Sequence, residues 1–374
     1  MINLQEIKGQ KILYVFEYFP PTTLGGAEIS GKIRVETLAK TNKIVVITPN
    51  YDQFKFKKTK NNYLLIKYPS LRYFLFKKRK NISHKIIKKN QKTFSTLLLF
   101  FNIINGIEMK YWIWKINRKY GPFHILHGNN IESDLGVAFS NIKIQKVAHL
   151  RDTRIFESFP IENKWQNRIH QFLKEYIIKK IAKKTDHFIV ISQFMKNKCA
   201  KILQVNEKNF HIVHNQVSQE QICELNKTES RKKINLDQKQ KYILFVGSLT
   251  KIKGVQFLIE EIAPKLPQLK FLIVGTGTLE EQLKENKPDN VIMTGFIPNA
   301  EVKYYYKAAD LVVVPSIWQE PWGRVSSEAQ ANNTFTIVND TGGLPETIEP
   351  GKGEVVKNEH LTEYLTNYFN LKHQ

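Results

Sequence analysis

The sequence has few cysteines and no long apolar run. Its two cysteines, Cys199 and Cys223, form neither a metal-binding spacing nor a disulfide framework, which fits a reducing compartment. No run reaches the roughly 18 to 20 apolar residues that a membrane-spanning helix needs. The nearest, Leu97 to Ile107, is interrupted by Asn102 and Asn105 and predicts a core helix or an interfacial face. The N-terminus also lacks the regions of a signal peptide, so we expect a cytoplasmic protein.

Acidic residues are missing between Lys55 and Lys92, a stretch that holds fourteen lysines and arginines. The formal net charge of +23 is also uneven, because residues 1–240 carry an excess of 26 positive charges and residues 241–374 an excess of 3 negative charges. A general preference for lysine would not favour one half. The first half is therefore expected to face something anionic: a membrane surface, a lipid phosphate or nucleic acid.

Part of this basic stretch has the pattern of an amphipathic helix. Ile82, Ile86 and Ile87 mark one face of a lysine-rich segment. Such a segment suits the anionic surface of a membrane, and this favours a protein held peripherally at the inner face of the membrane. RNA binding and an ordinary solvated face are the alternatives, and no recognised nucleic-acid module surrounds the segment.

Short apolar strands alternate with helical segments along the first half of the chain. Polar residues repeatedly follow these strands, as Gly128-Asn129-Asn130 and Arg151-Asp152 do. The predicted strands are Lys11–Phe16, Lys43–Thr48, Tyr63–Tyr68, Phe123–His127, Lys146–Leu150, His187–Ile191 and Phe210–Val213. This alternation predicts a Rossmann-like domain over residues 1–215.

The alternation restarts after residues 216–240, which are polar, lack an apolar period and are predicted to be a linker. The later strands, each followed by a glycine, proline or polar turn, are Tyr242–Val246, Lys270–Val274, Val291–Thr294, Leu311–Val314 and Phe335–Val338. Residues 241–374 are therefore predicted to form a second Rossmann-like domain. Two doubly wound α/β domains in one chain of 374 residues are expected to face each other across a cleft.

Two carboxylates, Glu320 and Glu328, stand out in the segment after the strand Leu311–Val314. The pattern predicts strand, loop and helix, with Glu320 on the loop, Glu328 in the first helical turns, and Ser326 or Ser327 as the helix cap. Ligands bind at this edge of open α/β sheets, and carboxylates there can accept hydrogen bonds from sugar hydroxyls. The alternative is a solvated loop glutamate and a glutamate favoured by the helix dipole.

A Gly-Gly turn, Gly25-Gly26, lies between the first strand and the first helix. Such a turn lets backbone amides approach a ligand, and the helix N-terminus favours anions. A plain tight turn is the alternative interpretation of this short motif.

Taken together, these motifs resemble the retaining GT-B glycosyltransferases of family 4 (glycosyl transferases group 1). The resemblance extends in order along most of the chain and is strongest from Tyr242 to Val356. The motifs are Gly25-Gly26-Ala27-Glu28, His214-Asn215, Gly247 with Lys253-Gly254, Gly275-x-Gly277, Pro315-Ser316, Glu320 with Glu328-Ala329, and Gly342-Gly343-x-Pro345-Glu346.

The resemblance implies a nucleotide-diphosphate sugar as donor, held mainly by residues 241–374. Glu328 would accept hydrogen bonds from the ribose hydroxyls, and Glu320 would contact the donor sugar, helped by backbone amides around Trp322, Gly323 and Arg324. Lys253 would neutralise the diphosphate, and Gly25 and Gly26 would close over the phosphates. No convincing Asp-x-Asp site occurs, so neither a metal nor another cofactor is expected, and lysine, amides and a helix dipole would balance the leaving group.

Three positions depart from the family pattern. Ser248 stands where the family often has arginine, so Arg324 or Arg151 could take over that cation's task. Arg151-Asp152 stands where His-Asp is common, and arginine is a bidentate clamp and not a general base, so Arg151 is assigned to orienting donor or acceptor. Only residues 357–374 follow the glycine-rich turn, which is barely enough for one helix, whereas family members usually continue with several helices.

The leading hypothesis is a hexosyltransferase-like retaining enzyme that acts on a cell-envelope, polysaccharide or lipid-linked acceptor. Its catalytic residues would be Glu320, Arg151 and Lys253, and Ser248, Gly323 and Arg324 would complete the donor site. A nucleotide-sugar epimerase shares this fold but would need acid and base carboxylates in the first domain. A basic nucleic-acid-binding protein is the third hypothesis; the charge supports it, but the glutamate pair and glycine turns do not.

Overall fold

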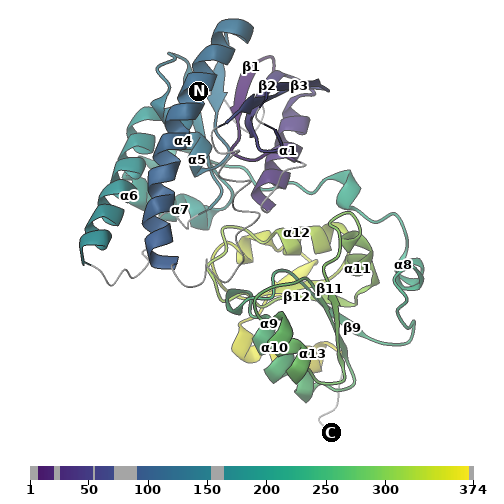
Figure 1. Cartoon of the computed structure of the whole chain (residues 1–374). Coiled ribbons are helices and arrows are strands. Elements are labelled where there is room, and N and C mark those ends of the chain that lie inside the picture. Colours follow the sequence, from purple (N-terminus) through teal and green to yellow (C-terminus); the bar gives the residue numbers. More distant parts are fainter. Residues whose placement is uncertain (1–6, 21–25, 54, 71–90, 153–163, 370–374) are drawn as a thin grey trace. The chain divides into compact units, whose positions relative to one another are not determined.

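The chain forms two compact units, Met1–His214 (unit 1) and Asn215–Gln374 (unit 2). The computed structural model describes residues 7–20, 26–53, 55–70, 91–152 and 164–369 (Figure 1). Each unit is built on a parallel sheet with helices on both faces. The prediction of an α/β fold with two parallel-sheet domains is therefore confirmed.

The unit 1 sheet has eight strands in the order β3-β4-β2-β1-β5-β6-β7-β8. All neighbours pair in parallel except β3 and β4, which are antiparallel. The strands are β1 (Lys11–Val15), β2 (Lys43–Asn50), β3 (Lys57–Lys60), β4 (Leu64–Pro69), β5 (Ile125–His127), β6 (Gln145–Leu150), β7 (His187–Val190) and β8 (Phe210–Ile212). Strand β3 was not predicted, because its sequence KKTK is polar and every residue is exposed at the edge of the sheet.

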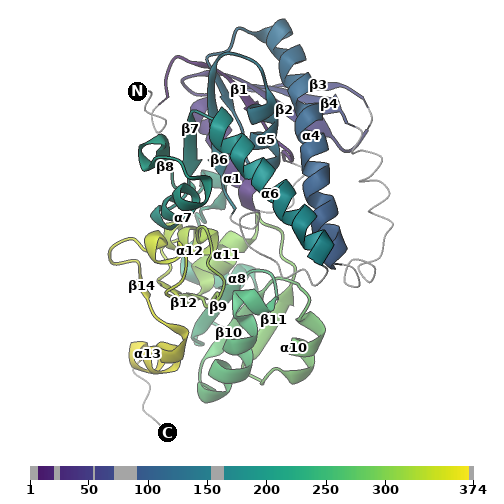
Figure 2. The same ribbon diagram turned by 90° about the vertical axis from the view of Figure 1, so that its left-hand side faces the viewer.

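Helices cover both faces of this sheet. The helices are α1 (Gly26–Leu38), α4 (Gln91–Tyr120), α5 (Ile131–Phe139), α6 (Lys164–Lys184) and α7 (Gln193–Leu203). Val35 and Leu38 of α1 pack on one face of the sheet, and Met109, Trp112 and Ile113 of α4 pack on the other with α5. Figure 2 shows α4 and α6 next to each other on this second face, where they contact each other and α5.

The unit 2 sheet has six strands in the order β11-β10-β9-β12-β13-β14, all parallel. They are β9 (Tyr242–Val246), β10 (Lys270–Val274), β11 (Val291–Gly295), β12 (Leu311–Val314), β13 (Thr336–Val338) and β14 (Gly353–Val355). Chain order reverses direction across the sheet at β9 and β12. This is the topological switch point, where open α/β sheets bind ligands at the carboxyl ends of their strands.

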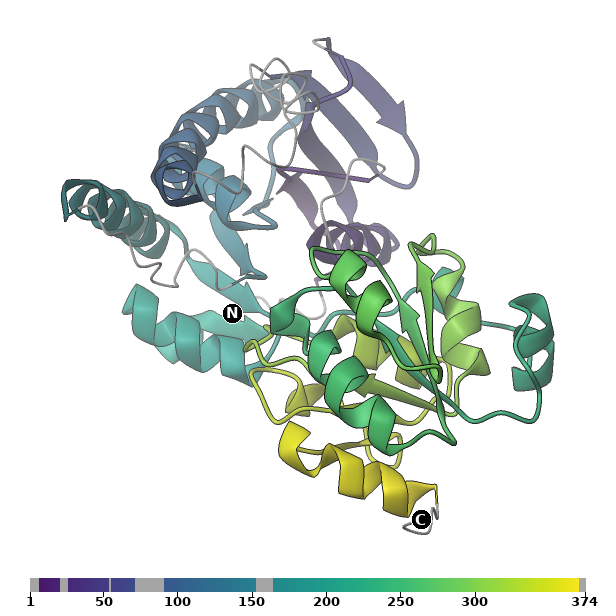
Figure 3. The same ribbon diagram turned by 60° about the horizontal axis from the view of Figure 1, so that its bottom comes forward.

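The helices of unit 2 are α8 (Lys227–Lys233), α9 (Val255–Phe257), α10 (Glu280–Asn286), α11 (Val302–Ala308), α12 (Arg324–Ala331) and α13 (Leu361–Tyr368). Helix α9 continues as a π-helical turn, Leu258–Ile262. This segment, α10 and α13 bury their apolar residues on one face of the sheet (Figure 3), and α11 and α12 bury theirs on the other.

Two predictions differ from the structure. Residues 216–240, predicted to be a linker, belong to unit 2, because Cys223 N–H bonds to Asn332 Oδ1 at 2.7 Å and Arg231 pairs with Asp310 at 2.7 Å. Helix α12 begins at Arg324 with Gly323 as its cap, so Ser326 and Ser327 lie inside the first turn and do not cap it. The predicted basic helix around Ile82 and Ile86 lies outside the described residues.

Candidate active site

Glu320 lies on the loop that connects β12 to α12, as the sequence predicts. Its carboxylate is almost fully buried, and Oε1 is 2.8 Å from the Nζ atom of Lys253. Lys253 ends a short 3-10 turn, Lys251–Lys253, which follows the carboxyl end of β9. The ammonium group also lies 5.7 Å from the centre of the Trp318 ring. The structure therefore brings the predicted sugar-contacting carboxylate and the predicted phosphate-binding cation into one ion pair.

Two glycines hold the loops of this ion pair in place. Gly254 has φ +71°, and a Cβ atom there would lie 2.0 Å from the carbonyl oxygen of Pro315. Gly342 has φ +59°, and a Cβ atom there would lie 2.5 Å from the carbonyl oxygen of Glu320. That same oxygen accepts a hydrogen bond from Gly343 N–H at 2.7 Å. Both positions require a left-handed backbone and a close backbone contact, which only glycine provides without strain.

Glu328 lies in α12 and is enclosed by hydrogen-bond donors. Its Oε1 atom accepts from Arg324 Nε at 3.2 Å and from Gln221 Nε2 at 2.8 Å. Its Oε2 atom accepts from the hydroxyl of Tyr306, in α11, at 2.9 Å. Burial, reinforced by the charge of Glu328, raises the pKa of Tyr306 well above its ordinary value. Tyr306 is therefore a neutral hydrogen-bond donor at physiological pH. Both carboxylate oxygens of Glu328 thus accept hydrogen bonds from the protein itself.

The other predicted donor-site residues of unit 2 lie nearby in the fold. Gly323 caps α12, and a Cβ atom there would lie 2.6 Å from Leu344, so the helix start is tightly packed. Trp322, next to it, donates from Nε1 to the Ser327 hydroxyl at 3.0 Å. Ser248 is exposed in the turn that follows β9. These residues all belong to segments after the carboxyl ends of β9 and β12, which is where the topology predicts a ligand.

Arg151 of unit 1 follows β6 and is buried, with 7% of its surface exposed. Its Nε atom donates to Asn129 Oδ1 at 3.1 Å, and its Nη2 atom lies 3.3 Å from His149 Nδ1. Asn129 follows β5, so two strand ends hold one guanidinium group in a fixed direction. The structure thus places a rigid, permanently charged group at the carboxyl edge of the unit 1 sheet.

Two buried histidines lie beside this arginine. Burial and the charges of Arg151 and Arg34 hold the pKa values of His127 and His149 well below the ordinary value. Both imidazoles are therefore neutral at pH 7, and His149 can accept from Arg151 through Nδ1. His127 stacks on Tyr14 with ring centres 4.0 Å apart, and the Tyr14 hydroxyl is 3.2 Å from His127 Nε2. These contacts are structural supports for the strand ends.

Gly26 begins helix α1, and Gly25 lies outside the described residues. Sequence reasoning missed Tyr306 and Gln221 as partners of Glu328. The sequence alone could not identify Tyr306, because α11 has three consecutive tyrosines in the sequence VKYYYKA and their spacing does not show which one faces inward. Gln221 was assigned to a linker. Asn129 was noticed as a polar residue after a strand, but its contact with Arg151 depends on the order of β5 and β6.

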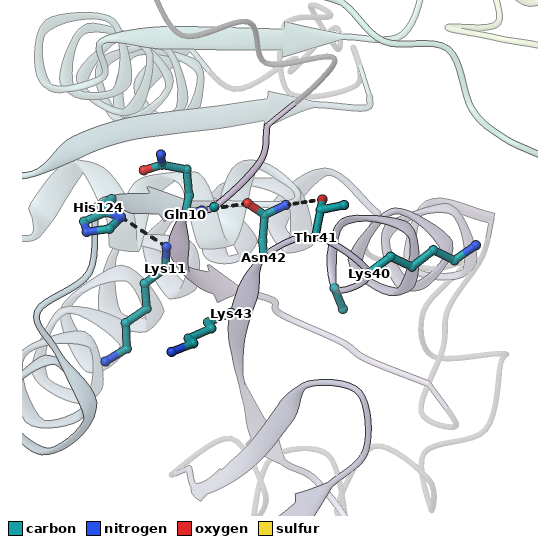
Figure 4. Close-up of a pocket in the computed structure, with 9 residues that line it drawn as sticks. Gln10, Lys11, Lys40, Thr41, Asn42, Lys43 and His124 are labelled. Atoms are coloured by element: carbon teal, nitrogen blue, oxygen red, sulfur yellow. Dashed lines mark hydrogen bonds between the residues drawn. The ribbon is translucent and has the colours of Figure 1, made fainter.

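A separate hollow of about 480 Å³ lies at the opposite, amino edge of the unit 1 sheet (Figure 4). It is lined by residues at the starts of β1 and β2, among them Gln10, Lys11, Asn42 and Lys43. The side-chain amide of Asn42 is hydrogen-bonded to the backbone there, since its Oδ1 accepts from Gln10 N–H at 2.9 Å and its Nδ2 donates to Ile7 O at 2.7 Å. The polar groups of this hollow therefore support the fold, and none of the predicted site residues lines it.

Within the described ranges, no cluster of three or more histidine, cysteine, aspartate or glutamate side chains could hold a metal ion. Among the helices of that part of the chain, none has both the length and the apolar character needed to cross a membrane.

Comparisons with known proteins were made for sequence and for structure. The sequence model of the family "Glycosyl transferases group 1" matches residues 226–371. An uncharacterized 41.2 kDa protein in the cps region of Klebsiella pneumoniae is 29% identical over 258 residues, which cover 67% of this chain and 67% of that protein. An uncharacterized glycosyltransferase of Methanocaldococcus jannaschii is 32% identical over 174 residues, which cover 43% of this chain and 44% of that protein. The chain thus spans under half the length of this second relative.

Solved structures resemble the chain over nearly its whole length. A sucrose-phosphate synthase from Thermosynechococcus elongatus has a TM-score of 0.72 at 19% identity, and covers 97% of this chain and 90% of its own. HepE of Anabaena, solved in complex with UDP, has a TM-score of 0.62 at 17% identity, with 96% and 90% covered. At these identities the structures establish the fold. The family match over residues 226–371, the glycosyltransferase relative and the shared fold together support a glycosyltransferase of GT-B fold.

Proposed function

We propose that the protein transfers a sugar from a nucleotide-diphosphate sugar to a cell-envelope, polysaccharide or lipid-linked acceptor, with retention of anomeric configuration and without a metal ion. The observation that carries the proposal is the paired arrangement in unit 2, where Glu320 contacts Lys253 and Glu328 contacts Arg324. Both pairs follow the strand ends next to the topological switch point, inside the segment that matches the glycosyl transferases group 1 family.

In this proposal the bound donor replaces the contacts within the two ion pairs by contacts to itself. The diphosphate competes with Glu320 for Lys253, and the released carboxylate then accepts hydrogen bonds from the donor sugar. Glu328 accepts from the ribose hydroxyls, and Arg324 turns from Glu328 toward the phosphates. Charge-assisted hydrogen bonds of this kind are among the strongest that a protein makes, so each exchange can be balanced by an equivalent contact.

The chemistry needs no side-chain nucleophile. The bond between the anomeric carbon and the phosphate oxygen breaks, and the acceptor oxygen bonds to that carbon on the same face. The acceptor proton passes to the departing phosphate oxygen, so the products are the glycoside and a nucleoside diphosphate. Lys253, Arg324 and the backbone amides at the start of α12 stabilise the negative charge that develops on the leaving group, which is the task a divalent ion performs elsewhere.

Unit 1 is assigned to the acceptor. Arg151 is fixed by Asn129 and His149 and would orient a phosphate or sugar group of the acceptor or donor. The charge of residues 1–240 supports an anionic partner, so we place the enzyme at the cytoplasmic face of a membrane. HepE, which shares the fold, was solved with UDP, and this makes uridine nucleotides the first donors to test.

Thermal unfolding with UDP-, GDP- and ADP-sugars, each with and without EDTA, tests the donor. A ligand that binds only the native state at a hundred times its Kd adds about 2.7 kcal/mol of stability, so a shift of the melting temperature is readily measured. We expect a shift with one nucleotide class, unchanged by EDTA. A shift that EDTA abolishes would overturn metal independence, and no shift with any nucleotide would overturn the donor assignment.

Replacing Glu320 tests the catalytic assignment. Glu320→Ala should abolish sugar transfer while circular dichroism and the melting transition remain those of a folded protein. Glu349→Ala is the matched control, because Glu349 also pairs with a lysine, Lys352 at 2.6 Å, but on the exposed surface. Full transfer activity in Glu320→Ala would refute the role of this carboxylate.

A further inference from the structure

Helix α4 carries an apolar stripe on the side that faces away from the core. Its members recur three or four positions apart, which places them on one helical face, and each is between 41% and 57% exposed. They are Phe100, Ile104, Ile107, Tyr111 and Trp114. The opposite side of the helix is also apolar, but it is buried in the unit 1 core. A helix that only covered a sheet would need the buried apolar side but not the exposed apolar stripe.

Helix α6 repeats the same arrangement. Trp165, Ile169, Phe172 and Tyr176 share its outward face, and between 40% and 71% of their surfaces is exposed. Ile177 and Ile181, on the opposite side, are buried. Exposed aromatic residues at this spacing on two separate helices exceed the scattered apolar residues that are normal on a soluble surface.

The two stripes belong to one side of unit 1. Helices α4 and α6 contact each other and α5 in the same layer (Figure 2). Each stripe is exposed, whereas other residues of the same helices are buried in the core. We call this surface the α4/α6 apolar face. It contains tryptophan, tyrosine and phenylalanine in high proportion, the residues that concentrate where protein meets the boundary between lipid headgroups and acyl chains.

Exposed basic residues accompany the α4/α6 apolar face, most of them in the last two turns of each helix, and we call them its basic rim. The exposed cations on these helices are Lys115, Arg118, Lys119, Arg168, Lys179, Lys183 and Lys184, and the acids among their described side chains are Glu108 and Glu175. Arg118 lies over the Trp114 ring, with its guanidinium carbon 5.1 Å from the ring centre. A second copy of this chain would bring the same positive rim against itself, whereas an anionic lipid surface complements it.

We propose that the α4/α6 apolar face docks on an anionic lipid membrane, with the aromatic side chains inserted at the headgroup level and the basic rim on the lipid phosphates. This inference rests on the proposed function, because it locates the membrane contact of the transferase on apolar residues of α4 and α6, which follow the basic stretch Lys55–Lys92 in the sequence. Docking through this face would hold unit 1 at the surface from which a lipid-linked acceptor projects.

Vesicle flotation of the full-length protein tests the proposal. Vesicles of phosphatidylcholine with 30% phosphatidylglycerol are compared with pure phosphatidylcholine, at low and high salt. The variant Ile107→Ser/Phe172→Ser removes one exposed side chain from each helix, and we expect its partition onto the anionic vesicles to fall by about tenfold or more. The control Ile292→Ser/Phe296→Ser removes the same residue types from the exposed surface of unit 2 and should bind as the unchanged protein does.

Nucleotide-sugar stabilisation, oligomeric state and RNA binding are measured as well, to separate the outcomes. Nucleotide-sugar stabilisation should be the same in all three proteins, so a loss of vesicle binding with intact donor binding isolates the membrane contact. A donor-binding failure in every protein would refute the proposed function without affecting the flotation result. Equal flotation of the Ile107→Ser/Phe172→Ser variant and the control would overturn the inference. So would a dimeric unchanged protein and a monomeric variant in size-exclusion chromatography, with equal flotation of the two. Salt-sensitive RNA binding that the variant loses, in place of lipid binding, would also overturn it.

Discussion

The contact between Tyr306 and Glu328 gives a prediction whose size follows from the structure. Tyr306→Phe removes only the hydroxyl group, which donates to Glu328 Oε2 at 2.9 Å in a buried setting. A hydrogen bond to a charged group contributes about 1.5–3 kcal/mol, and the loss leaves a buried carboxylate oxygen without this donor. We therefore expect the free energy of unfolding to fall by about 2 kcal/mol.

Urea unfolding followed by circular dichroism and tryptophan fluorescence measures this loss. Tyr305→Phe is the matched control, since Tyr305 precedes Tyr306 in the same helix and is only partly buried; it should change stability by less than about 0.5 kcal/mol. A double-mutant cycle with Glu328→Ala isolates the contact, because Tyr306→Phe should cost almost nothing once the carboxylate is gone. An equal cost of Tyr306→Phe in both backgrounds would refute the idea that the hydroxyl acts through Glu328.

Three other predictions concern the donor cation, the buried histidine and the glycine turns. Lys253→Met should weaken nucleotide-sugar binding in calorimetry by at least about tenfold, because a diphosphate loses a charged partner, while Lys251→Met, exposed two positions earlier, should not. Burial and a neighbouring arginine lower the pKa of His149, so the unfolded chain takes up a proton near pH 6.5 that the folded chain refuses. Stability should therefore decrease as the pH falls through this range, and His149→Gln should lose this component in urea titrations. Gly254→Ala should lower the melting temperature strongly, because its Cβ would meet a backbone carbonyl at 2.0 Å, while Gly351→Ala, with φ +76° and open space, should cost only about 1 kcal/mol.

The strands and the sheet class were predictable because buried parallel strands are short, continuous apolar runs. The run Leu311–Val314 became β12 with the predicted bounds, and Tyr242–Val246 became β9. Gly247 after the first of these runs and Pro315 after the second indicated where each strand ends. Strand β3 escaped prediction because an exposed edge strand has no apolar side that burial would require.

The sequence predicts candidate site residues but not the contacts among them. The sequence gives Glu320, Lys253, Glu328 and Arg324 as candidates, and their pairing depends on which loops adjoin in the sheet order β9-β12. The helix cap was predicted wrongly at Ser326 or Ser327, since serine is a frequent cap. In the structure close packing around Gly323 starts the helix earlier and leaves both serines in its first turn.

The ion pair between Lys253 and Glu320 has a consequence for selectivity. Lys253 is already paired with Glu320. An incoming anion therefore gains only the difference between its own attraction to the lysine and the attraction of the carboxylate that it displaces. A simple anion such as chloride or inorganic phosphate brings nothing for the displaced carboxylate, which would be left buried and unpaired. A sugar diphosphate brings hydroxyl donors along with its phosphates and can satisfy both partners at once. In the proposed function, the pair would therefore favour a ligand that carries both a diphosphate and sugar hydroxyls over a ligand that carries only one of them.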